Sequence, residues 1–347
     1  MHRVRGGVQY YTWGKPASES WIKNFTEEPQ ENKPYAEYWL GTHPSLPTTF
    51  GSQSIKEVTG ELNFLFKALA VAKPLSIQVH PNKVQAQELY SQSPHLYPDS
   101  NYKPEMCIAM SPMKLFYGFK SSQEIQQTLD STPELRELVG NANSTQEKLQ
   151  KLFEDETFTL QQLRKYLARA KDSQEFKIYE KVHKEFPEDV GLFFMMFMHY
   201  LELSPGEAVE IHPGVPHCYL EGECLEAMAC SDNVVRAGLT SKHKDVATLL
   251  RIVDYLSTSH PKIKLPKEVT KGIKEYPSSY PDFKVVLVES SEQVTLDQGF
   301  PFLGIVLEGS ATTQHLDLQQ GSSYLILEPA CIQPTPYLKL YLCGVNS

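Results

Sequence analysis

The pattern of apolar and polar positions predicts strands over much of the N-terminal third of the chain. Up to about Gly118 it includes an apolar run at residues 64–72 and a stretch of strict alternation at residues 75–80, and both are typical of strands in a folded core. Many of the 24 prolines lie between such short runs. Prolines in these positions favour an all-β sandwich or barrel.

Between residues 121 and 184 the pattern changes to helical spacing. Glu, Gln, Lys and Leu become frequent, and apolar residues recur three or four positions apart, as at Leu160, Leu163 and Leu167. Pro133 follows Ser131 and Thr132, which is typical of a helix that begins with proline in its first turn. We therefore expect a helical segment here.

Strand-like patterns return after this segment. We expect strands at residues 195–203 and 223–229, a turn at Pro205-Gly206, and a helical connector at 245–255. Beyond about Phe283, short strands and glycines alternate, as in a second β-unit. The predicted division is a first barrel at residues 1–120 and 188–255, a helical insertion at 121–187, and a C-terminal β-domain at 256–347.

Composition limits the class of protein. The chain has 347 residues, of which 41% are hydrophobic and 22% charged, as in ordinary globular proteins of about two domains. Its longest apolar run, at 190–198, is too short to span a bilayer, and no signal-peptide pattern follows Met1. We expect a soluble, cytoplasmic protein without a membrane partner, and a monomer.

Charge and cysteine content narrow the partners further. The formal net charge of −9 makes nucleic acid an unfavourable partner, so an anionic ligand would need a local basic cluster. The six cysteines form no CxxC pair, and free thiols are expected. Cys218, Cys224 and Cys230 repeat every six residues, but Gly222 interrupts the run, so zinc–thiolate binding is not expected.

Three segments offer side chains that bind metal ions. Ser76, Gln78 and His80 share one face if their segment is a strand, and a polar face inside a barrel is explained by a metal ion, although solvent exposure would explain it too. Lys103 and Glu105 share a face in the same way, or form a surface ion pair. A hairpin after Pro205-Gly206 leads to His217.

Together these segments supply Gln78, His80, Glu105 and His217. Two imidazoles with one carboxylate suit zinc and also non-haem iron(II). A divalent ion in this set would leave one net positive charge, which attracts oxyanions.

A fourth segment, residues 226–242, brings together carboxylates and cations. It contains Glu226, Asp232, Arg236 and Lys242. Arginine suits phosphate or the charge that develops on an enolate, whereas the alternative is a charged loop whose members pair with one another.

These segments resemble the type I mannose-6-phosphate isomerase (phosphomannose isomerase) family of the cupin superfamily. The matching blocks, in family order, are QYYTWG at 9–14, PYAEYWLGTHP at 34–44, QVHP at 78–81, KPEM at 103–106, PHCY at 216–219 and SDNVVRAGLT at 231–240. The resemblance covers most of residues 9–254 and is weak in the C-terminal part.

The resemblance implies a mainly β fold with an α insertion, in which cupin-like jelly-roll barrels carry a helical domain inserted in the first. It implies one zinc ion per chain on Gln78, His80, Glu105 and His217, and a sugar-phosphate substrate. Arg236 would be catalytic, with Glu226, Lys103 and Asp232 as further catalytic candidates. The expected substrate-binding residues are Ser76, Lys242 and Trp13.

The implied reaction interconverts mannose 6-phosphate and fructose 6-phosphate through a cis-enediol. Among the candidates for the base we favour Glu226. Most members of the family have His where this chain has Tyr102, which leaves the ring-opening step without its usual imidazole. The alternatives are a non-haem iron oxygenase and a sugar-phosphate-binding cupin without activity, and fold alone does not separate them.

Overall fold

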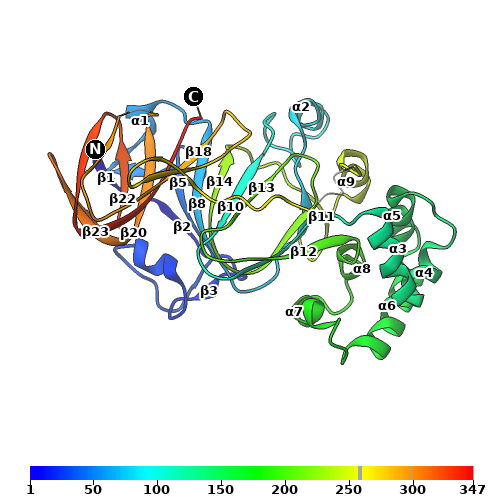
Figure 1. The fold of residues 1–347 in the computed structure, drawn as a ribbon. Helices are drawn as coiled ribbons and strands as arrows, with labels where there is room; N and C mark the ends of the chain where they lie inside the picture. The colour runs from blue at the N-terminus through cyan, green and yellow to red at the C-terminus, as the bar shows by residue number, and fades with distance from the viewer. Residues whose placement is uncertain (257–259, 298, 347) are drawn as a thin grey trace.

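The structure is a computed structural model that describes residues 1–256, 260–297 and 299–346. In these ranges the chain is mainly β and forms one sheet of ten strands and one of nine. In Figure 1 the nine-stranded sheet lies at the left, the ten-stranded sheet in the middle and most helices at the right. The expected mainly β, cupin-like fold is confirmed.

The ten-stranded sheet is organised around its longest strand, β14, which pairs antiparallel with β8, β9, β10 and β11. Its members are β2 (Gly7–Gln9), β5 (Glu37–Gly41), β8 (Phe64–Val71), β9 (Ile77–Val79), β10 (Glu105–Ala109), β11 (Met113–Phe119), β12 (Met198–Leu203), β13 (Ala208–Ile211), β14 (His217–Ala229) and β15 (Val235–Gly238).

The nine-stranded sheet is built from the C-terminal part of the chain and from its first residues, because β1 pairs antiparallel with β22. Its members are β1 (His2–Val4), β16 (Lys267–Thr270), β17 (Ile273–Tyr276), β18 (Lys284–Ser290), β19 (Val294–Leu296), β20 (Phe302–Thr313), β21 (Asp317–Gln319), β22 (Ser323–Ile326) and β23 (Ala330–Gly344). Two further pairs are β3 (Lys15–Pro16) with β4 (Pro34–Tyr35), and β6 (Thr49–Phe50) with β7 (Gln53–Ser54).

The predicted helical segment lies between β11 and β12. It contains α3 (Ser122–Ser131), α4 (Pro133–Val139), α5 (Thr145–Glu154), α6 (Glu156–Ala170) and α7 (Lys177–Glu185), whereas the short helix α8 (Gly191–Met195) lies beyond its predicted end. Pro133 occupies the first turn of α4, as predicted, and Ser121 and Ser144 close capping boxes on α3 and α5. The other helices are η1 (Trp21–Phe25), α1 (Lys56–Thr59), α2 (Lys83–Gln92) and α9 (Val246–Ile252).

Two predicted strand starts are wrong: the strand expected from Glu223 already begins at His217, as part of β14. The strand expected from Met195 begins at Met198, and α8 ends at Met195. Every residue from Gly191 to Met198 is buried, so the pattern has no polar side from which helix and strand could be told apart. The three domain boundaries stay predictions.

Alternation along β8 gives the ten-stranded sheet two different faces. Phe64, Phe66 and Ala68 pack in a core that continues into the nine-stranded sheet. Leu65, Lys67 and Leu69 alternate with them and line a cavity on the other face, as expected for a strand buried on both sides.

The neighbouring strands follow the same rule. On β14, Leu225 and Ala227 join the core between the sheets, whereas Glu226 and Met228 line the cavity. On β10, Met106 joins that core and Glu105 faces the cavity. Charged side chains of strands far apart in sequence therefore meet on one face.

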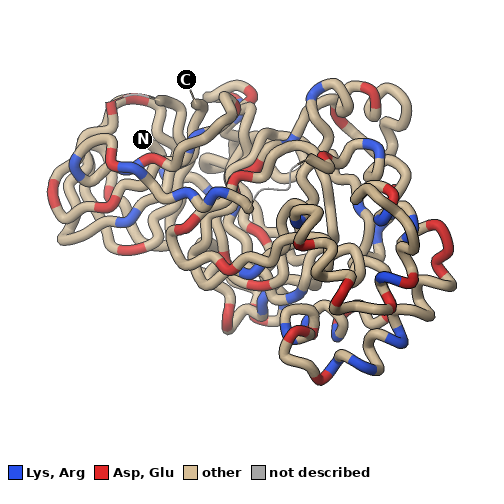
Figure 2. The backbone as a smooth tube through the Cα atoms, turned by 45° about the vertical axis from the view of Figure 1, so that its right-hand side comes forward, with Lys and Arg blue, Asp and Glu red and all other residues tan. Residues whose placement is uncertain are grey.

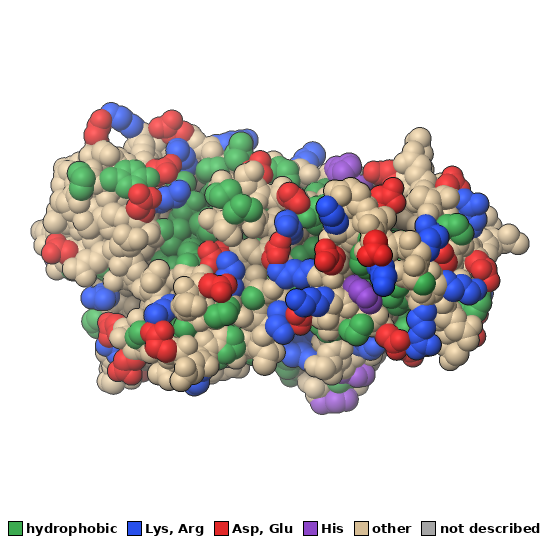
Figure 3. Space-filling model, turned by 90° about the horizontal axis from the view of Figure 1, so that it is seen from below, with side chains coloured by type: hydrophobic (Ala, Val, Ile, Leu, Met, Phe, Trp, Pro, Cys, Tyr) green, Lys and Arg blue, Asp and Glu red, His purple; other side chains and the backbone are tan. Residues whose placement is uncertain are grey.

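Charged residues of both signs are spread along the whole chain (Figure 2). Seen from below, Lys and Arg side chains lie close to Asp and Glu near the middle of the face (Figure 3). None of the described helices combines the length and the apolar character needed to cross a bilayer.

Candidate active site

A cavity of about 660 Å³ opens on the inner face of the ten-stranded sheet. All predicted site residues except His80 and His217 line it: Trp13, Ser76, Gln78, Lys103, Glu105, Glu226, Asp232, Arg236 and Lys242. The two histidines are fully buried next to it. The structure thus brings the whole predicted set together.

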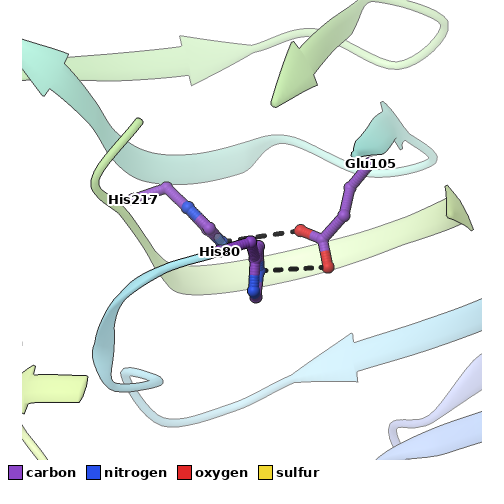
Figure 4. Close-up of side chains that lie close together, drawn as sticks. All are labelled: His80, Glu105 and His217. Carbon is purple, nitrogen blue, oxygen red and sulfur yellow. Dashed lines mark ion pairs between the residues drawn. The ribbon is translucent and has the colours of Figure 1, made fainter. Parts of the chain in front are cut away.

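At the base of the cavity, His80, Glu105 and His217 converge (Figure 4). Nε2 of His80 lies 3.4 Å from Oε1 of Glu105, and Nε2 of His217 lies 3.5 Å from Oε2 of the same carboxylate. Glu105 begins β10 and His217 begins β14, while His80 directly follows β9. The three ligand-type side chains therefore come from three strand ends.

Hydrogen bonds to the backbone orient both imidazoles toward the carboxylate. Nδ1 of His80 donates to the carbonyl of Asn233 (2.8 Å), and Nδ1 of His217 donates to the carbonyl of Val215 (3.0 Å). With the protons on Nδ1, each ring presents the lone pair of Nε2 to the centre.

Two atoms of this cluster are buried without a hydrogen-bond partner: Nε2 of His80 and Oε2 of Glu105. Leaving such groups unsatisfied is unfavourable, and a cation between them would satisfy both. Two imidazoles and a carboxylate are a ligand set that zinc accepts. The residues therefore fit a metal ion of this kind.

Gln78 completes the predicted ligand set geometrically. It pairs across the sheet with both His217 on β14 and Arg236 on β15. Its amide nitrogen lies 3.1 Å from Nε2 of His217. Rotating the side-chain amide of Gln78 by 180° would exchange its nitrogen and oxygen atoms. The oxygen, which is the atom suited to a metal, would then face Nε2 of His217.

The protonation states of His80 and Glu105 favour the binding of a cation. Burial lowers the pKa of His80 to about 4, so the ring is neutral at physiological pH. Burial alone would raise the pKa of Glu105, but His80 and the Lys103 ammonium hold it well below its usual range. Nζ of Lys103 lies 3.4 Å from Oε1 of Glu105.

A buried hydrogen-bond network holds the loop that orients His80, and no local pattern of residues indicates these hydrogen bonds. Asn233 is fully buried, and its side-chain amide donates to the carbonyls of Asp99 (2.8 Å) and Asn101 (2.9 Å). Ser231 donates to Oδ1 of Asp99 (2.9 Å). The carbonyl that receives the proton of His80 is fixed in this way.

Lys67 is a site residue that sequence analysis missed. Its ammonium lies 3.5 Å from Oε2 of Glu37, 3.7 Å from Oε2 of Glu226 and 4.7 Å from the centre of the Trp39 ring. Burial alone would lower the pKa of Lys67, but the two carboxylates raise it. A single lysine in the apolar run 64–72 was the signal that could have identified it.

Among the carboxylates of Glu105, Glu226 and Asp232, that of Glu226 has the highest proton affinity. Burial and the negative charge of Glu105 raise the pKa of Glu226 to about 7, against the opposing effect of Lys67 and Lys103. The hydroxyl of Tyr219 donates to Oε1 of Glu226 (3.0 Å). A carboxylate of this kind can take up and release a proton near neutral pH.

Asp232 lies at the rim of the cavity in a different environment. Its carboxylate is half exposed and accepts a hydrogen bond from Nε2 of His43 (3.1 Å). This hydrogen bond lowers the pKa of Asp232. Asp232 is therefore a weaker base than Glu226.

Arg236 and Lys242 provide positive charge opposite these carboxylates. Among the described residues neither forms an ion pair, although Nζ of Lys242 lies 5.5 Å from the centre of the Tyr11 ring. Burial lowers the pKa of both, and for Lys242 the charge of Arg236 adds to the effect. Two cations without carboxylate partners on a cavity wall favour an anionic ligand.

Tyr102 points away from the cavity. Its hydroxyl donates to Asp282, and Nζ of Lys83 lies 4.5 Å from the centre of its ring. Tyr102 does not line the cavity, whereas its neighbour Lys103 does. This is the alternation expected of an extended segment.

Comparison with known proteins identifies relatives along the whole chain. The family model for the phosphomannose isomerase type I catalytic domain matches residues 1–122. Mannose-6-phosphate isomerase of Homo sapiens is 34% identical over 387 aligned residues, which cover 92% of this chain and 91% of the relative. Mannose-6-phosphate isomerase 1 of Arabidopsis thaliana is 33% identical over 409 aligned residues, with 100% and 94% covered.

Solved structures agree with the sequence relatives. The apo form of mannose 6-phosphate isomerase from Salmonella typhimurium superposes with a TM-score of 0.86 at 26% identity, over 100% of this chain and 99% of that chain. A mannose 6-phosphate isomerase bound with zinc and yttrium gives a TM-score of 0.85 at 26% identity, over 100% of both chains.

Proposed function

The chain belongs to the type I phosphomannose isomerase family, and from this premise we propose that it interconverts D-mannose 6-phosphate and D-fructose 6-phosphate through a cis-enediol. Family membership favours this activity over the oxygenase and over the inactive binding protein. The observation that carries the proposal is a metal-type cluster and a carboxylate with a pKa of about 7 in the same cavity.

One zinc ion would be held by Gln78, His80, Glu105 and His217. The chemistry it supplies when bound is Lewis acidity toward sugar oxygens, which lowers the energy of negative charge on them. The unpaired atoms of His80 and Glu105 support this ligand set.

Glu226 would act as the base. It takes the proton from C2 of the open-chain aldose; the electron pair forms the C1–C2 double bond as the carbonyl oxygen at C1 gains a proton. The proton then returns to C1 while the hydroxyl at C2 loses its own and becomes the ketone. A group with a pKa near the working pH suits both directions.

Cations of the cavity would stabilise the charge that develops. Arg236 would face the oxygens that become negative in the transition state, and Lys103 would donate to the same part of the sugar. Lys242 and Ser76 would hold the phosphate, and Trp13 would line the substrate site. Asp232 is the alternative base.

The test compares Glu226→Gln with the matched variant Asp232→Asn in deuterated water. The wild-type protein should introduce deuterium at C1 of fructose 6-phosphate, measured by NMR. Glu226→Gln should lower turnover by about 10²–10⁴-fold, and Asp232→Asn by less than about tenfold. A larger loss in Asp232→Asn would move the base to Asp232. Fully protonated product after many turnovers would contradict the enediol.

A further inference from the structure

We propose a second metal site, for Zn²⁺, at Glu124, His199 and His260. Glu124 lies in the first turn of α3, His199 in β12, and His260 between α9 and β16. One nitrogen of each histidine and one carboxylate oxygen lie within 4.8 Å of one another. None of the three residues lines the cavity of the candidate active site.

The distance between His260 and Glu124 is close to the distances in the first cluster. Nε2 of His260 lies 3.6 Å from Oε1 of Glu124, compared with 3.4 and 3.5 Å for the pairs around Glu105. Tetrahedral zinc with bonds of about 2.0–2.2 Å holds its ligands roughly 3.3–3.5 Å apart. The spacing of His260 and Glu124 is therefore within a few tenths of an ångström of the spacing that zinc requires.

The capping box of α3 prepares the carboxylate for this role. Oε2 of Glu124 accepts hydrogen bonds from the backbone nitrogen (2.8 Å) and the hydroxyl (2.7 Å) of Ser121. These bonds fix the plane of the carboxylate and leave Oε1 directed at His260. One oxygen is thus used by the helix and the other is presented to a ligand.

The nearby cation does not occupy this position. The ammonium of Lys120 donates to the carbonyl of Met196 (2.8 Å) and to the hydroxyl of Thr128 (3.2 Å). Lys120 is therefore engaged on the backbone and on α3. The charge of Glu124 is left to the two imidazoles.

The two imidazoles lie close enough to share one divalent ion. The rings of His199 and His260 lie with their centres 4.0 Å apart at an angle of 37°, compared with 4.9 Å for His80 and His217. An ion pair of Glu124 with His260, whose side chain is 71% exposed, contributes little on its own.

The site would have three protein ligands and an open side. His199 is 2% exposed and His260 lies at the surface, so water can complete the tetrahedron. A bound ion would tie the segment before β16 to α3 and β12. Its role is structural, because it lies outside the catalytic cavity.

Zinc stoichiometry of the full-length protein tests the proposal. After equilibration with micromolar Zn²⁺ and removal of free ion, elemental analysis should give two zinc ions per chain for the wild type. His217→Ala and His260→Ala should each retain one, and the double variant none. The matched control His315→Ala, an exposed histidine elsewhere, should retain two, and isomerase activity of His260→Ala should equal that of the wild type.

A second variant separates loss of the ligand from loss of the helix cap. Gln preserves the capping box, so Glu124→Gln should keep the thermal stability of the apo protein and weaken the second zinc at least tenfold. One zinc in the wild type, or two in His260→Ala, would overturn the proposal. Neither result would contradict the proposed catalytic zinc site, because His217→Ala reports on that ion separately.

Discussion

At the scale of single residues, Lys67 is expected to lower the pKa of Glu226, against the effects of burial and of Glu105. Activity should fall as pH drops through the pKa of Glu226, about 7, because only the carboxylate accepts a proton. Lys67→Met removes the positive charge 3.7 Å from Glu226 and should move this acidic limb about one unit to higher pH. The measurement is a profile of kcat against pH, with zinc content determined at each pH.

Lys67→Arg is the comparison that retains the charge. Its acidic limb should stay close to that of the wild type. The contradicting result is an active Lys67→Met variant whose acidic limb of the kcat–pH profile does not move. In that case the limb does not report the ionisation of Glu226, and the assignment of Glu226 as the base is wrong.

Substitutions of Arg236 and of Lys242 should change different kinetic constants. Arg236→Ala should lower kcat by roughly 10²–10³-fold, as expected when one preorganised donor to a developing oxyanion is lost. Lys242→Ala should mainly raise KM, and this effect should shrink at high salt because the lysine is exposed to solvent. Steady-state kinetics at two ionic strengths measures both. A loss confined to KM in Arg236→Ala would make Arg236 a phosphate ligand instead.

Residues within short motifs could be predicted, whereas residues that meet only through strand pairing could not. Gln78 lies in β9 and His80 directly follows it, and Glu105 follows Lys103 by two positions, so local alternation was sufficient to suggest them. Lys67 meets Glu226 because β8 and β14 pair in that register. The residues of β8 alone do not indicate which residues of β14 they pair with.

At the scale of elements, the segment that carries Lys103 and Glu105 places Tyr102 against the C-terminal part of the chain. Tyr102→Phe removes the hydrogen bond to Asp282 but no contact with the cavity. We expect kcat within about tenfold of the wild type, less than the loss of a general acid or base. The free energy of unfolding should fall by about 1 kcal/mol.

Kinetics and thermal denaturation of Tyr102→Phe and Asp282→Ala test this together. Both variants should lose a similar amount of stability and keep their activity. A loss of several hundred-fold in kcat for Tyr102→Phe, with zinc bound and the fold intact, would show that the phenol acts in the cavity.

The type of most long elements followed from their periodicity. The apolar run 64–72 is β8, the expected connector at 245–255 is α9, and the turn at Pro205-Gly206 is present, with Gly206 at a φ of +89°. The boundary at Met195 failed because α8 and the start of β12 are buried on all sides. A segment that is buried on all sides has no polar face, so the spacing of apolar and polar residues no longer distinguishes a helix from a strand.

At the scale of the whole molecule, the acidic chain gathers several cations in one cavity, where they lie among carboxylates. The net charge is −9, yet Lys67, Lys103, Arg236 and Lys242 line one cavity. The overall charge disfavours non-specific binding of polyanions, whereas Arg236 and Lys242 in the cavity are available to a small anion. Long-range strand pairing, which joins β1 to β22, could not be predicted from local patterns.

The most direct test of the account is a coupled assay of the purified protein with mannose 6-phosphate, before and after removal of metal by a chelator. The account predicts conversion to fructose 6-phosphate by the untreated protein, loss of turnover in the metal-free protein, and recovery when zinc is returned. Full activity in a preparation shown to contain no metal would contradict it.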